Sequence, residues 1–307
     1  MNFAEESFSA SPLSYNSKEV QKMLKKSKIF AAIVIVLCLA CAASAEVITY
    51  QHVRNATAKI HYAGSVFLVD PFLAEKGAYP GFDGTPNSDK RIPLIDMAEP
   101  AQDVINGIDA VILTHTHLDH WDDTAREILP KDIPFFVQNA GDARTIREQG
   151  FTNVMVTGKN TPFRNVHISR TLGQHGPDEL YSVPARAEFA GDAMGFVFQA
   201  DGEKTLYVVG DTTWHPFVEV ALRTYNPDII VMNTGYAMVN GINGSLIMGK
   251  DDILRMYKAM PKAKIITVHM NAVNHTITSS EEVRELVKEN SLSDRVYVPR
   301  EGEILSF

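Results

Sequence analysis

The amino-acid sequence predicts an α+β fold in which β-sheets are covered by helices. Two patterns carry this prediction. Short alternating or β-branched runs are joined by tight turns, which indicates hairpins. Other apolar runs lead directly into segments of helical period, which indicates strand–helix units. Residues 46–307 contain no internal repeat, no low-complexity block and no evident linker, so we expect them to form one domain.

The first half of that domain is expected to begin with strands. Alternating or β-branched residues predict strands at 46–53, 58–64 and 65–71, and the last two are joined by a turn at Gly64. Beyond them, capping residues and prolines set the limits of the next elements. These are a strand at 108–114, a helix at 121–130, a strand at 133–138 and a helix at 140–150.

Residues 75–93 separate these two groups and are rich in Gly, Pro and Asp. A connection of roughly twenty residues is longer than most loops, and this length favours a functional role. We therefore expect this segment to be a flap at the rim of a pocket. The glycine-containing segment 235–250 is expected to form another part of the rim.

The second half follows the same style of alternating strands and helices. Apolar runs predict strands at 166–173, 193–200, 204–211, 228–235 and 263–270, and further strands within 295–307. Helical periodicity predicts helices at 215–225, 250–261 and 279–290. The last of these opens with serines and acidic residues, which suit a helix N-terminus.

Residues 1–45 are predicted to be an N-terminal export signal. A basic stretch at 25–28 precedes an apolar run of about fifteen residues, which is typical of a signal sequence and short for a membrane span. The small residues at 43–45 form the pattern that a signal peptidase cleaves. We therefore expect a periplasmic or secreted protein, although an uncleaved membrane anchor at 29–45 stays open.

The polar segment 1–22 is unusually long for the start of a signal, so translation from Met23 is an alternative. Both cysteines of the chain, Cys38 and Cys41, lie inside the signal. Cleavage before Glu46 would leave no cysteine, and the mature chain could then form no disulfide and offer no thiolate to a metal.

The formal net charge is −8 and the sequence pI is about 5.7. This acidic balance argues against nucleic acid as a partner, because phosphate binding needs a basic surface. We expect a small-molecule substrate, and membrane contact only through the N-terminal signal or an uncleaved anchor. A homo-oligomer is compatible with the sequence.

One short stretch, THTHLDHW, gathers three of the ten histidines directly after an apolar strand. His115 and His117 are two residues apart, so in extended chain they point to the same side. Asp119 and His120 follow where the backbone turns toward the next helix and can face a second point nearby. Imidazole nitrogens and carboxylate oxygens are ligands that suit Zn, Mn or Fe.

Three more ligand candidates each follow an apolar strand, namely His175, Asp211 and His269. Ligands at strand ends are rigidly placed, so strands that meet at one sheet edge would form a preorganised site. Each candidate also has a structural alternative. His175 could be a surface histidine, Asp211 could cap the helix that begins near Pro216, and His269 competes with the nearby His275.

Other polar residues have less specific patterns. Asp70 could brace the cluster or simply end a strand, and His215 could line the pocket or begin a helix. His52, His61 and His167 lie within expected strands, where a structural role is the better interpretation.

The order HxHxDH, then His175, Asp211 and His269, resembles the metallo-β-lactamase fold superfamily. The stretches RNATAKIHYAGSVFLVDPFLAEKGAYPGF, GQHG, GDAMGFVF, GDTTW and HMNAVNH more narrowly resemble the branch that includes ascorbate-6-phosphate lactonase-like hydrolases. This resemblance covers essentially all of residues 46–307. It implies a four-layer αββα sandwich with a binuclear metal site.

The same resemblance implies a ligand arrangement. His115, His117 and His175 would hold one ion, Asp119, His120 and His269 would hold the other, and Asp211 would bridge them. Two divalent ions, Zn or Mn with Fe also open, lower the pKa of a shared water so that a hydroxide forms near neutral pH. Asp119 could in addition accept or return a proton and is therefore the catalytic candidate.

The function expected from these features is metal-dependent hydrolysis of a small lactone, ester or phosphoester. The sequence contains no GxSxG nucleophile motif and no P-loop. Two other classes stay open. One is a non-catalytic binding protein stabilised by metals, and the other is an iron-dependent oxidoreductase of the same fold, for which the sequence provides no electron-carrier domain.

Overall fold

The structure, a computed structural model, describes residues 18, 21–22, 47–184, 187 and 190–307. The chain divides into two compact units, Met1–Ala45 and Glu46–Phe307. Apart from residues 18 and 21–22, the predicted export signal at 1–45 lies outside the described residues, as do the alternative start at Met23 and the anchor at 29–45. No helix within the described ranges has the length and apolar character needed to cross a membrane.

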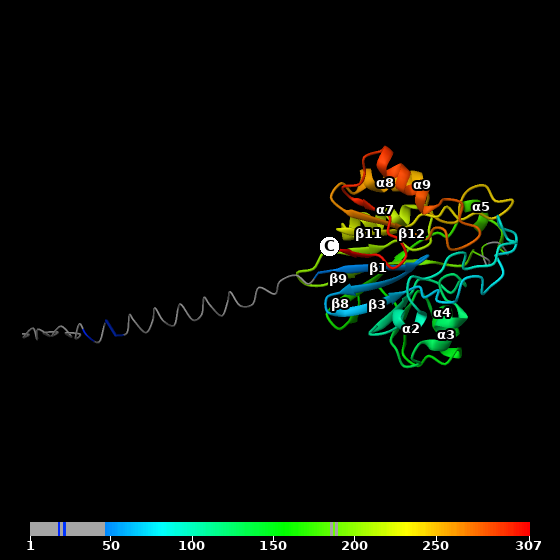
Figure 1. Cartoon of the computed structure of the whole chain (residues 1–307). Coiled ribbons are helices and arrows are strands. Elements are labelled where there is room, and N and C mark those ends of the chain that lie inside the picture. Colours follow the sequence, from blue (N-terminus) through cyan, green and yellow to red (C-terminus); the bar gives the residue numbers. More distant parts are fainter. Residues whose placement is uncertain (1–17, 19–20, 23–46, 185–186, 188–189) are drawn as a thin grey trace, which may run out of the picture. The chain divides into compact units, whose positions relative to one another are not determined.

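The second unit contains two sheets of seven strands each, which lie face to face (Figure 1). The first sheet has the order β14-β1-β2-β3-β4-β5-β6, and the second has the order β13-β12-β11-β10-β9-β8-β7. In the first sheet the strands are β1 (Thr49–Arg54), β2 (Thr57–Tyr62), β3 (Ser65–Val69), β4 (Ala110–Leu113), β5 (Phe135–Val137), β6 (Val154–Val156) and β14 (Ile304–Ser306). In the second they are β7 (Thr161–Phe163), β8 (Val166–Leu172), β9 (Met194–Gln199), β10 (Leu206–Val208), β11 (Ile229–Asn233), β12 (Lys264–Val268) and β13 (Val296–Tyr297).

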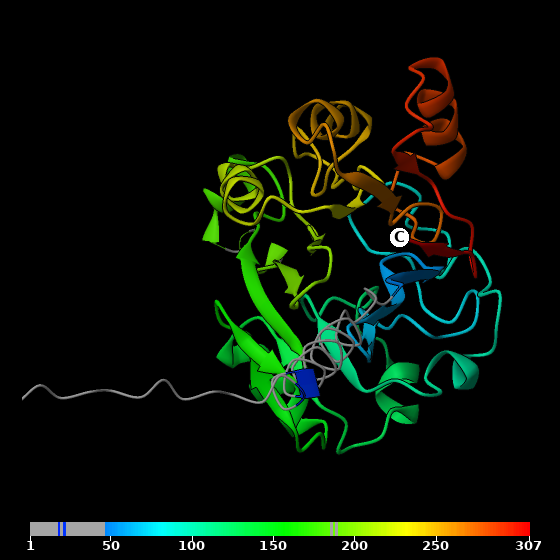
Figure 2. The ribbon, with the colours of Figure 1, turned by 90° about the vertical axis from the view of Figure 1, so that its left-hand side faces the viewer.

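Helices cover the outer face of each sheet, which makes the four layers of the predicted αββα sandwich. On one side lie α7 (Pro216–Tyr225), α8 (Lys250–Ala259) and α9 (Ser280–Glu289), which Figure 2 shows as a row of yellow to red coils. On the other side lie α2 (Ala101–Val104), α3 (Asp123–Ile128) and α4 (Ala140–Glu148). The short helix α5 (Asp178–Tyr181) lies among the loops at one end. The predicted fold class is therefore confirmed.

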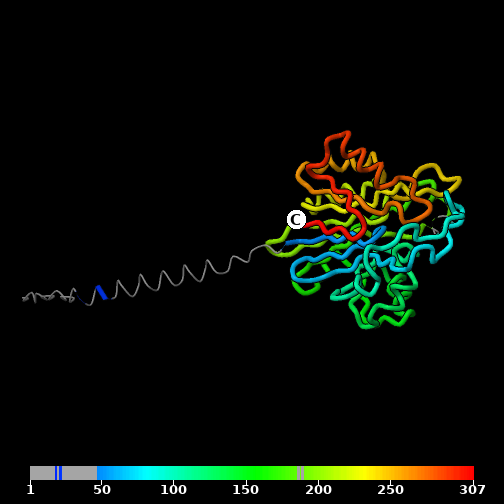
Figure 3. The backbone as a smooth tube through the Cα atoms, in the orientation of Figure 1, coloured from blue at the N-terminus to red at the C-terminus, as the bar shows by residue number. Residues whose placement is uncertain are grey.

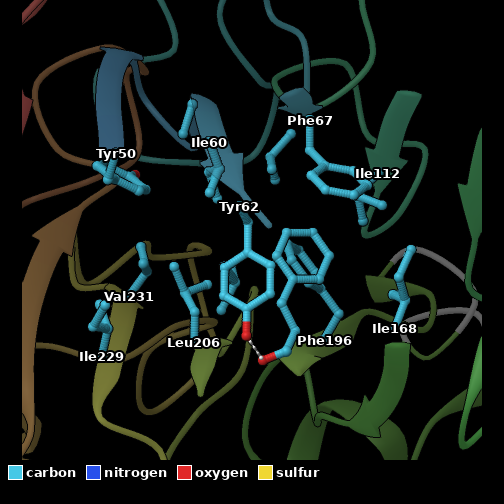
Figure 4. Close-up of a cluster of buried hydrophobic side chains, with 14 of the residues drawn as sticks. Tyr50, Ile60, Tyr62, Phe67, Ile112, Ile168, Phe196, Leu206, Ile229 and Val231 are labelled. Carbon is cyan, nitrogen blue, oxygen red and sulfur yellow. Dashed lines mark hydrogen bonds between the residues drawn. The ribbon is translucent and has the colours of Figure 1, made fainter. Parts of the chain in front are cut away.

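The main core fills the space between the sheets (Figure 4). Ile60 and Phe67 project from the first sheet toward the second, where the ring of Phe67 packs against that of Phe198 with centroids 4.4 Å apart. Tyr62 donates a hydrogen bond from its hydroxyl to the backbone carbonyl of Phe198 at 3.1 Å. Alternate residues of the same strands face outward. Met232, next to Val231 on β11, packs in a second cluster beneath the helices. Burial on both faces explains why these strands read as continuous apolar runs.

Both sheets change from antiparallel to parallel pairing along their length. In the first sheet β3, β4 and β5 are parallel, and in the second β10, β11, β12 and β13 are parallel. The carboxyl ends of parallel strands share one edge, which is where binding sites form in such sheets. Asp70, Asn233 and His269 lie at strand ends on this edge. The segments that follow β4 and β10, which carry other ligand candidates, begin at the same edge.

The loop at 75–93 lies at the same end of the sandwich as residues 236–249, as the cyan and yellow segments of Figure 3 show. The two are joined where the backbone N–H of Asn240 donates to the carbonyl of Gly84 at 2.8 Å. The sequence did not predict β6, β7, α2 or α5. Each of these elements has only three or four residues, too few to show a period.

Candidate metal centre

The histidine-rich stretch follows β4 and turns sharply at its centre. The backbone N–H groups of His120 and Trp121 both donate to the carbonyl of His117, at 3.0 and 2.8 Å. This turn brings Asp119 and His120 beside His115, although an extended chain would hold them apart. The side chains of His115, Asp119 and His120 are buried, and that of His117 is partly exposed.

The structure brings together all seven predicted ligand residues. Their candidate ligand atoms form three groups, and within each group the atoms lie no more than 4.8 Å apart. The groups are His115, His117 and His175; His115, His120 and Asp211; and Asp119, His120 and His269. The first and third are the two triads that the resemblance implies. His275 belongs to none of the three groups among the described residues.

Asp211 lies between the two triads. Its Oδ2 is 3.2 Å from Nε2 of His120, 3.6 Å from Nε2 of His269 and 3.7 Å from Nε2 of His175. Its other oxygen, Oδ1, accepts a hydrogen bond from Nδ2 of Asn233 at 2.5 Å. One carboxylate oxygen is thus anchored while the other faces ligand nitrogens of both triads.

The helix-capping alternative for Asp211 is wrong. The N-cap of α7 is His215, whose Nδ1 accepts a hydrogen bond from the backbone N–H of Phe217 at 3.3 Å. Asp211 instead follows a sharp turn at Gly210, where φ is +76° and a Cβ would collide with the carbonyl of Met194. Only glycine adopts this conformation without strain, so Gly210 helps to aim Asp211 into the cluster.

The charges of this cluster fit a divalent cation. Burial disfavours the ionised carboxylates, but His120 holds the pKa of both Asp119 and Asp211 well below its usual range. Burial also lowers the pKa of His117 to about 4, so its ring is neutral, as a metal ligand must be. Burial opposes a charge on His120, but Asp211 and Asp119 raise its pKa well above the usual value, so without metal this imidazole carries the balancing positive charge. A bound metal would take over that role as the proton leaves. The nitrogen and oxygen ligand set suits Zn or Mn.

Neighbouring groups fix the orientation of the ligands. Nδ1 of His120 lies 2.9 Å from Oδ2 of Asp70, whose two oxygens also accept hydrogen bonds from Thr114 at 2.7 Å. Nδ1 of His175 lies 3.2 Å from the backbone carbonyl of Leu246. Such partners set the tautomer and rotation of a ligating imidazole. Asp70 therefore braces the cluster, which the sequence analysis had left open.

Sequence reasoning missed Asn55. This buried residue occupies the turn between β1 and β2 with φ of +57°, a conformation that Asn tolerates better than most residues. Its Nδ2 lies 3.1 Å from the carbonyl oxygen of Asp119 and 3.3 Å from Nε2 of His269. The only signal in the sequence is a polar residue at a hairpin turn, which is common in any protein.

A pocket of about 180 Å³ lies over the ligand cluster. Its floor includes His117, Asp119, His175 and Asp211. The remaining residues that line it are Phe82, Thr85, Leu118, Ala190, Val239, Leu246 and His275. Residues from the predicted flap and from the 235–250 segment therefore form the rim, as expected.

Asn274 holds the rim together. Its Oδ1 accepts a hydrogen bond from the backbone N–H of Phe82 at 2.9 Å. Its Nδ2 donates to Oγ1 of Thr85 and to the carbonyl of Pro86, both at 2.8 Å. With its side chain 1% exposed, Asn274 ties residues 82–86 to the segment that follows His269. The expected flap is thus fastened to the body of the domain.

The beta-lactamase superfamily domain matches this sequence over residues 67–270. Among individual proteins, the chain is 44% identical to the UPF0173 protein YddR of Bacillus subtilis (strain 168), over 83% of this chain and 98% of that protein. It is also 27% identical to a UPF0173 metal-dependent hydrolase of Bacillus cereus (strain Q1), over 71% of this chain and 83% of that protein.

Two crystal structures are similar across the whole domain. One is described as a possible metal-dependent hydrolase from Veillonella parvula DSM 2008, with a TM-score of 0.84 and 46% identity over 85% of this chain and 100% of that chain. The other is an isothiocyanate hydrolase from Delia radicum gut bacteria, with a TM-score of 0.82 and 42% identity over 84% of this chain and 99% of that chain. The chain therefore belongs to the metallo-β-lactamase superfamily and, within it, to the UPF0173 family of metal-dependent hydrolases.

Proposed function

We propose that this chain hydrolyses small uncharged molecules that contain an electron-poor carbon, with isothiocyanates as the leading class. The observation that carries the proposal is the pocket of about 180 Å³ above the ligand cluster. Its walls are mostly apolar, with Phe82, Leu118 and Val239 among them. A pocket of this size and character favours a compact molecule with an apolar substituent.

The pocket favours carbon electrophiles over phosphoesters. No Lys or Arg is among the described residues that line it, whereas a site for an anionic phosphate is usually built with cationic side chains. The 42% identity with an isothiocyanate hydrolase supports the same choice. Lactones and esters, which the resemblance to lactonase-like hydrolases suggests, remain in the proposed class because they too present an uncharged electrophilic carbon.

Two divalent ions, Zn or Mn, would supply an activated water and an electrophile for developing negative charge. His115, His117 and His175 would hold one ion, and Asp119, His120 and His269 the other, with Asp211 between them. The net reaction adds water across the C=N bond of R–N=C=S, with oxygen on carbon and hydrogen on nitrogen. The resulting thiocarbamic acid breaks its C–N bond to give an amine and carbonyl sulfide.

The protein groups contribute proton transfer and exclusion of water. Asp119 is ionised on the pocket floor and is proposed to accept a proton from the incoming water and return it to the substrate nitrogen. Asn55 holds the backbone of Asp119 in place, because its side-chain amide donates a hydrogen bond to the Asp119 carbonyl. The apolar walls keep bulk water away from the reacting carbon and strengthen electrostatic interactions there.

The test combines metal analysis with a substrate panel. Purified protein should contain close to two ions per chain and hydrolyse allyl isothiocyanate, with amine formation as the readout. The panel adds a γ-lactone, a p-nitrophenyl ester, a phosphodiester and a β-lactam. Asp119→Asn should lose at least about 10²-fold in kcat, whereas Asp123→Asn, an exposed neighbour, should keep it. Full activity after exhaustive chelation, or activity on the phosphodiester alone, would overturn the proposal.

We also propose that the hydrolase is exported, on the strength of the basic, apolar and small-residue pattern at 25–45. Cell fractionation with N-terminal sequencing tests this. A mature protein that begins at Glu46 outside the cytoplasm is the expected result. A cytoplasmic protein that keeps residues 23–45 would refute it, and a membrane-bound one would favour the anchor.

A further inference from the structure

His275 is a buried histidine in the pocket whose chemistry is not used by the ligand cluster. Its side chain is 8% exposed, and it lines the same pocket as Asp119 and Asp211. Nδ1 is sealed from solvent and has no hydrogen-bond partner. Within the described part of the chain, no group hydrogen-bonds to Nε2 either. Because Nδ1 is enclosed, Nε2 is the ring nitrogen that can reach the pocket.

Packing holds this ring in place. The ring of Phe82 meets the His275 ring nearly edge-on, with centroids 4.8 Å apart and an interplanar angle of 84°. The carbonyl of His275 accepts a hydrogen bond from the backbone N–H of Met238 at 2.9 Å. The preceding residue, Asn274, is fixed by its own bonds to the rim. These contacts hold the ring with one edge toward the pocket.

A fixed, buried and unpaired imidazole is costly unless something binds it. A buried polar group that lacks a hydrogen bond destabilises the folded protein. Buried histidine nitrogens are normally paired with a polar group, as Nδ1 of the ligand candidate His175 is with the carbonyl of Leu246. Nδ1 of His275 has no such partner and is closed off from the pocket, so Nε2 is the polar atom of this ring that a ligand can bind.

The protonation of the ring makes it a hydrogen-bond donor. Burial lowers the pKa of His275 to about 4, so the ring is neutral near pH 7 and carries one N–H. A proton on Nδ1 would be a buried donor without an acceptor. The tautomer with its proton on Nε2 avoids this and directs the N–H toward the pocket.

We propose that His275 is a catalytic residue that donates a hydrogen bond from Nε2 to the substrate heteroatom on which negative charge develops. In an isothiocyanate this atom is nitrogen or sulfur, and in a lactone or ester it is the carbonyl oxygen. The inference rests on the proposed function, because it assigns His275 a role at the same site. A preorganised donor aimed at developing charge typically contributes about 10²–10³-fold to kcat.

The kinetic test uses variants of similar shape. His275→Phe keeps a ring against Phe82 but removes the donor, and His275→Gln restores an N–H. With allyl isothiocyanate, His275→Phe should lower kcat about 10²–10³-fold with little change in KM, and His275→Gln should recover about tenfold. Metal content and melting temperature should match the wild type. His61→Phe, at an exposed position on β2, is the matched control and should behave as wild type.

Loss of bound metal in His275→Phe would show that His275 is a ligand and would overturn the proposal. A kcat within about threefold of the wild type would overturn it as well, since that corresponds to less than about 1 kcal/mol.

A binding measurement separates this proposal from the proposed function. Allylthiourea is an uncharged, unreactive probe with the same N–C=S skeleton. In the zinc-loaded protein it should shift the Nε2 resonance of His275, and His275→Phe should bind it at least about tenfold more weakly. If the wild type hydrolyses no member of the panel but binds the probe through His275, the proposed function and the catalytic role of His275 fail, whereas hydrogen bonding from His275 to a ligand in the pocket stands. Equal binding by both proteins, or no binding to the wild type, counts against the assignment.

Discussion

The side-chain amide of Asn55 donates a hydrogen bond to the backbone carbonyl of Asp119 at 3.1 Å, across 64 positions of sequence. The same amide nitrogen lies 3.3 Å from Nε2 of His269, a residue of the other sheet. A turn at the start of the domain thus supports ligands from both halves of the site. Groups that support ligands in this way usually matter for metal affinity nearly as much as the ligands do.

Replacement of Asn55 by Gly should weaken metal binding by about 10–100-fold. Glycine accepts the positive φ of 57° without strain, so the substitution removes only the amide. Competition with a chelator measures the affinity. Ala63→Gly, at φ of 47° in the next hairpin turn, is the control for added backbone freedom. Equal affinities for the Asn55 variant and the wild type would contradict a supporting role for this amide.

Asp70→Asn should destabilise the protein and weaken its metal site. The Asp70 carboxylate accepts hydrogen bonds from the backbone N–H and the hydroxyl of Thr114, and it lies against the ring of His120. The side-chain NH₂ of an asparagine would place a donor against one of these donors. We expect a loss of about 1.5–3 kcal/mol in the free energy of unfolding by urea. Chelator competition should show about 10–100-fold weaker metal binding. Asp109→Asn, at a carboxylate that is 24% exposed and lies just before β4, should leave the metal affinity unchanged.

Asn274→Ala should release the rim of the pocket. The substitution removes one buried and two partly buried hydrogen bonds to residues 82–86. Amide exchange at Phe82 should accelerate by about 5–150-fold, since one to three lost hydrogen bonds contribute about 1 kcal/mol each. KM should rise because the wall formed by Phe82 is no longer fixed. Asn290→Ala breaks a single bond on the surface, to the carbonyl of Leu286, and should change neither quantity.

The metal-free protein should lose stability as the pH falls from 6.5 toward 4, in part through His52. This residue is 5% exposed and its Nδ1 has no partner. Burial, with a smaller effect of the Arg284 charge, lowers the pKa of His52 from 6.5 to about 4. Between these values the unfolded chain binds a proton that the folded chain does not, so acid favours unfolding. The linked free energy is on the order of 3 kcal/mol.

Urea unfolding of the chelated protein at several pH values measures this effect. His52→Leu removes the titrating group and should reduce the slope of stability against pH between 4 and 6.5. Above pH 7 the slopes of the two proteins should coincide. All other histidines are present in both proteins, so the comparison isolates the contribution of His52. Parallel curves down to pH 4 would show that His52 takes no part.

Strand ends explain why so much of this site was predictable from sequence. His269 directly follows a buried run, and Asp211 follows Gly210 after another, so local patterns placed both at a sheet edge. The contacts of Asn55 and Asn274 are different. Asn274 meets Thr85 across 189 positions. Neither residue belongs to a periodic pattern, and a single polar side chain in a loop gives no signal of its distant partner.

Substrate preference was also beyond the sequence pattern. The ligands of a metal centre determine how the attacking water is activated, but they do not determine which substrate it attacks. The sequence pattern therefore indicated no preference among lactones, esters and phosphoesters. The choice depends on walls that come from separate loops, such as Phe82, Val239 and Leu246. Their apolar side chains look like ordinary core residues until folding gathers them around one small space.

The seven ligand residues are divided between the sheets in chain order. Four follow β4 of the first sheet, and the other three follow strands of the second. A backbone cut between β6 and β7 would therefore yield two polypeptides, each with an incomplete cage for metal. Because neither fragment completes both triads alone, a divalent ion would link them, and reassembly of the split enzyme should require metal and reverse on chelation.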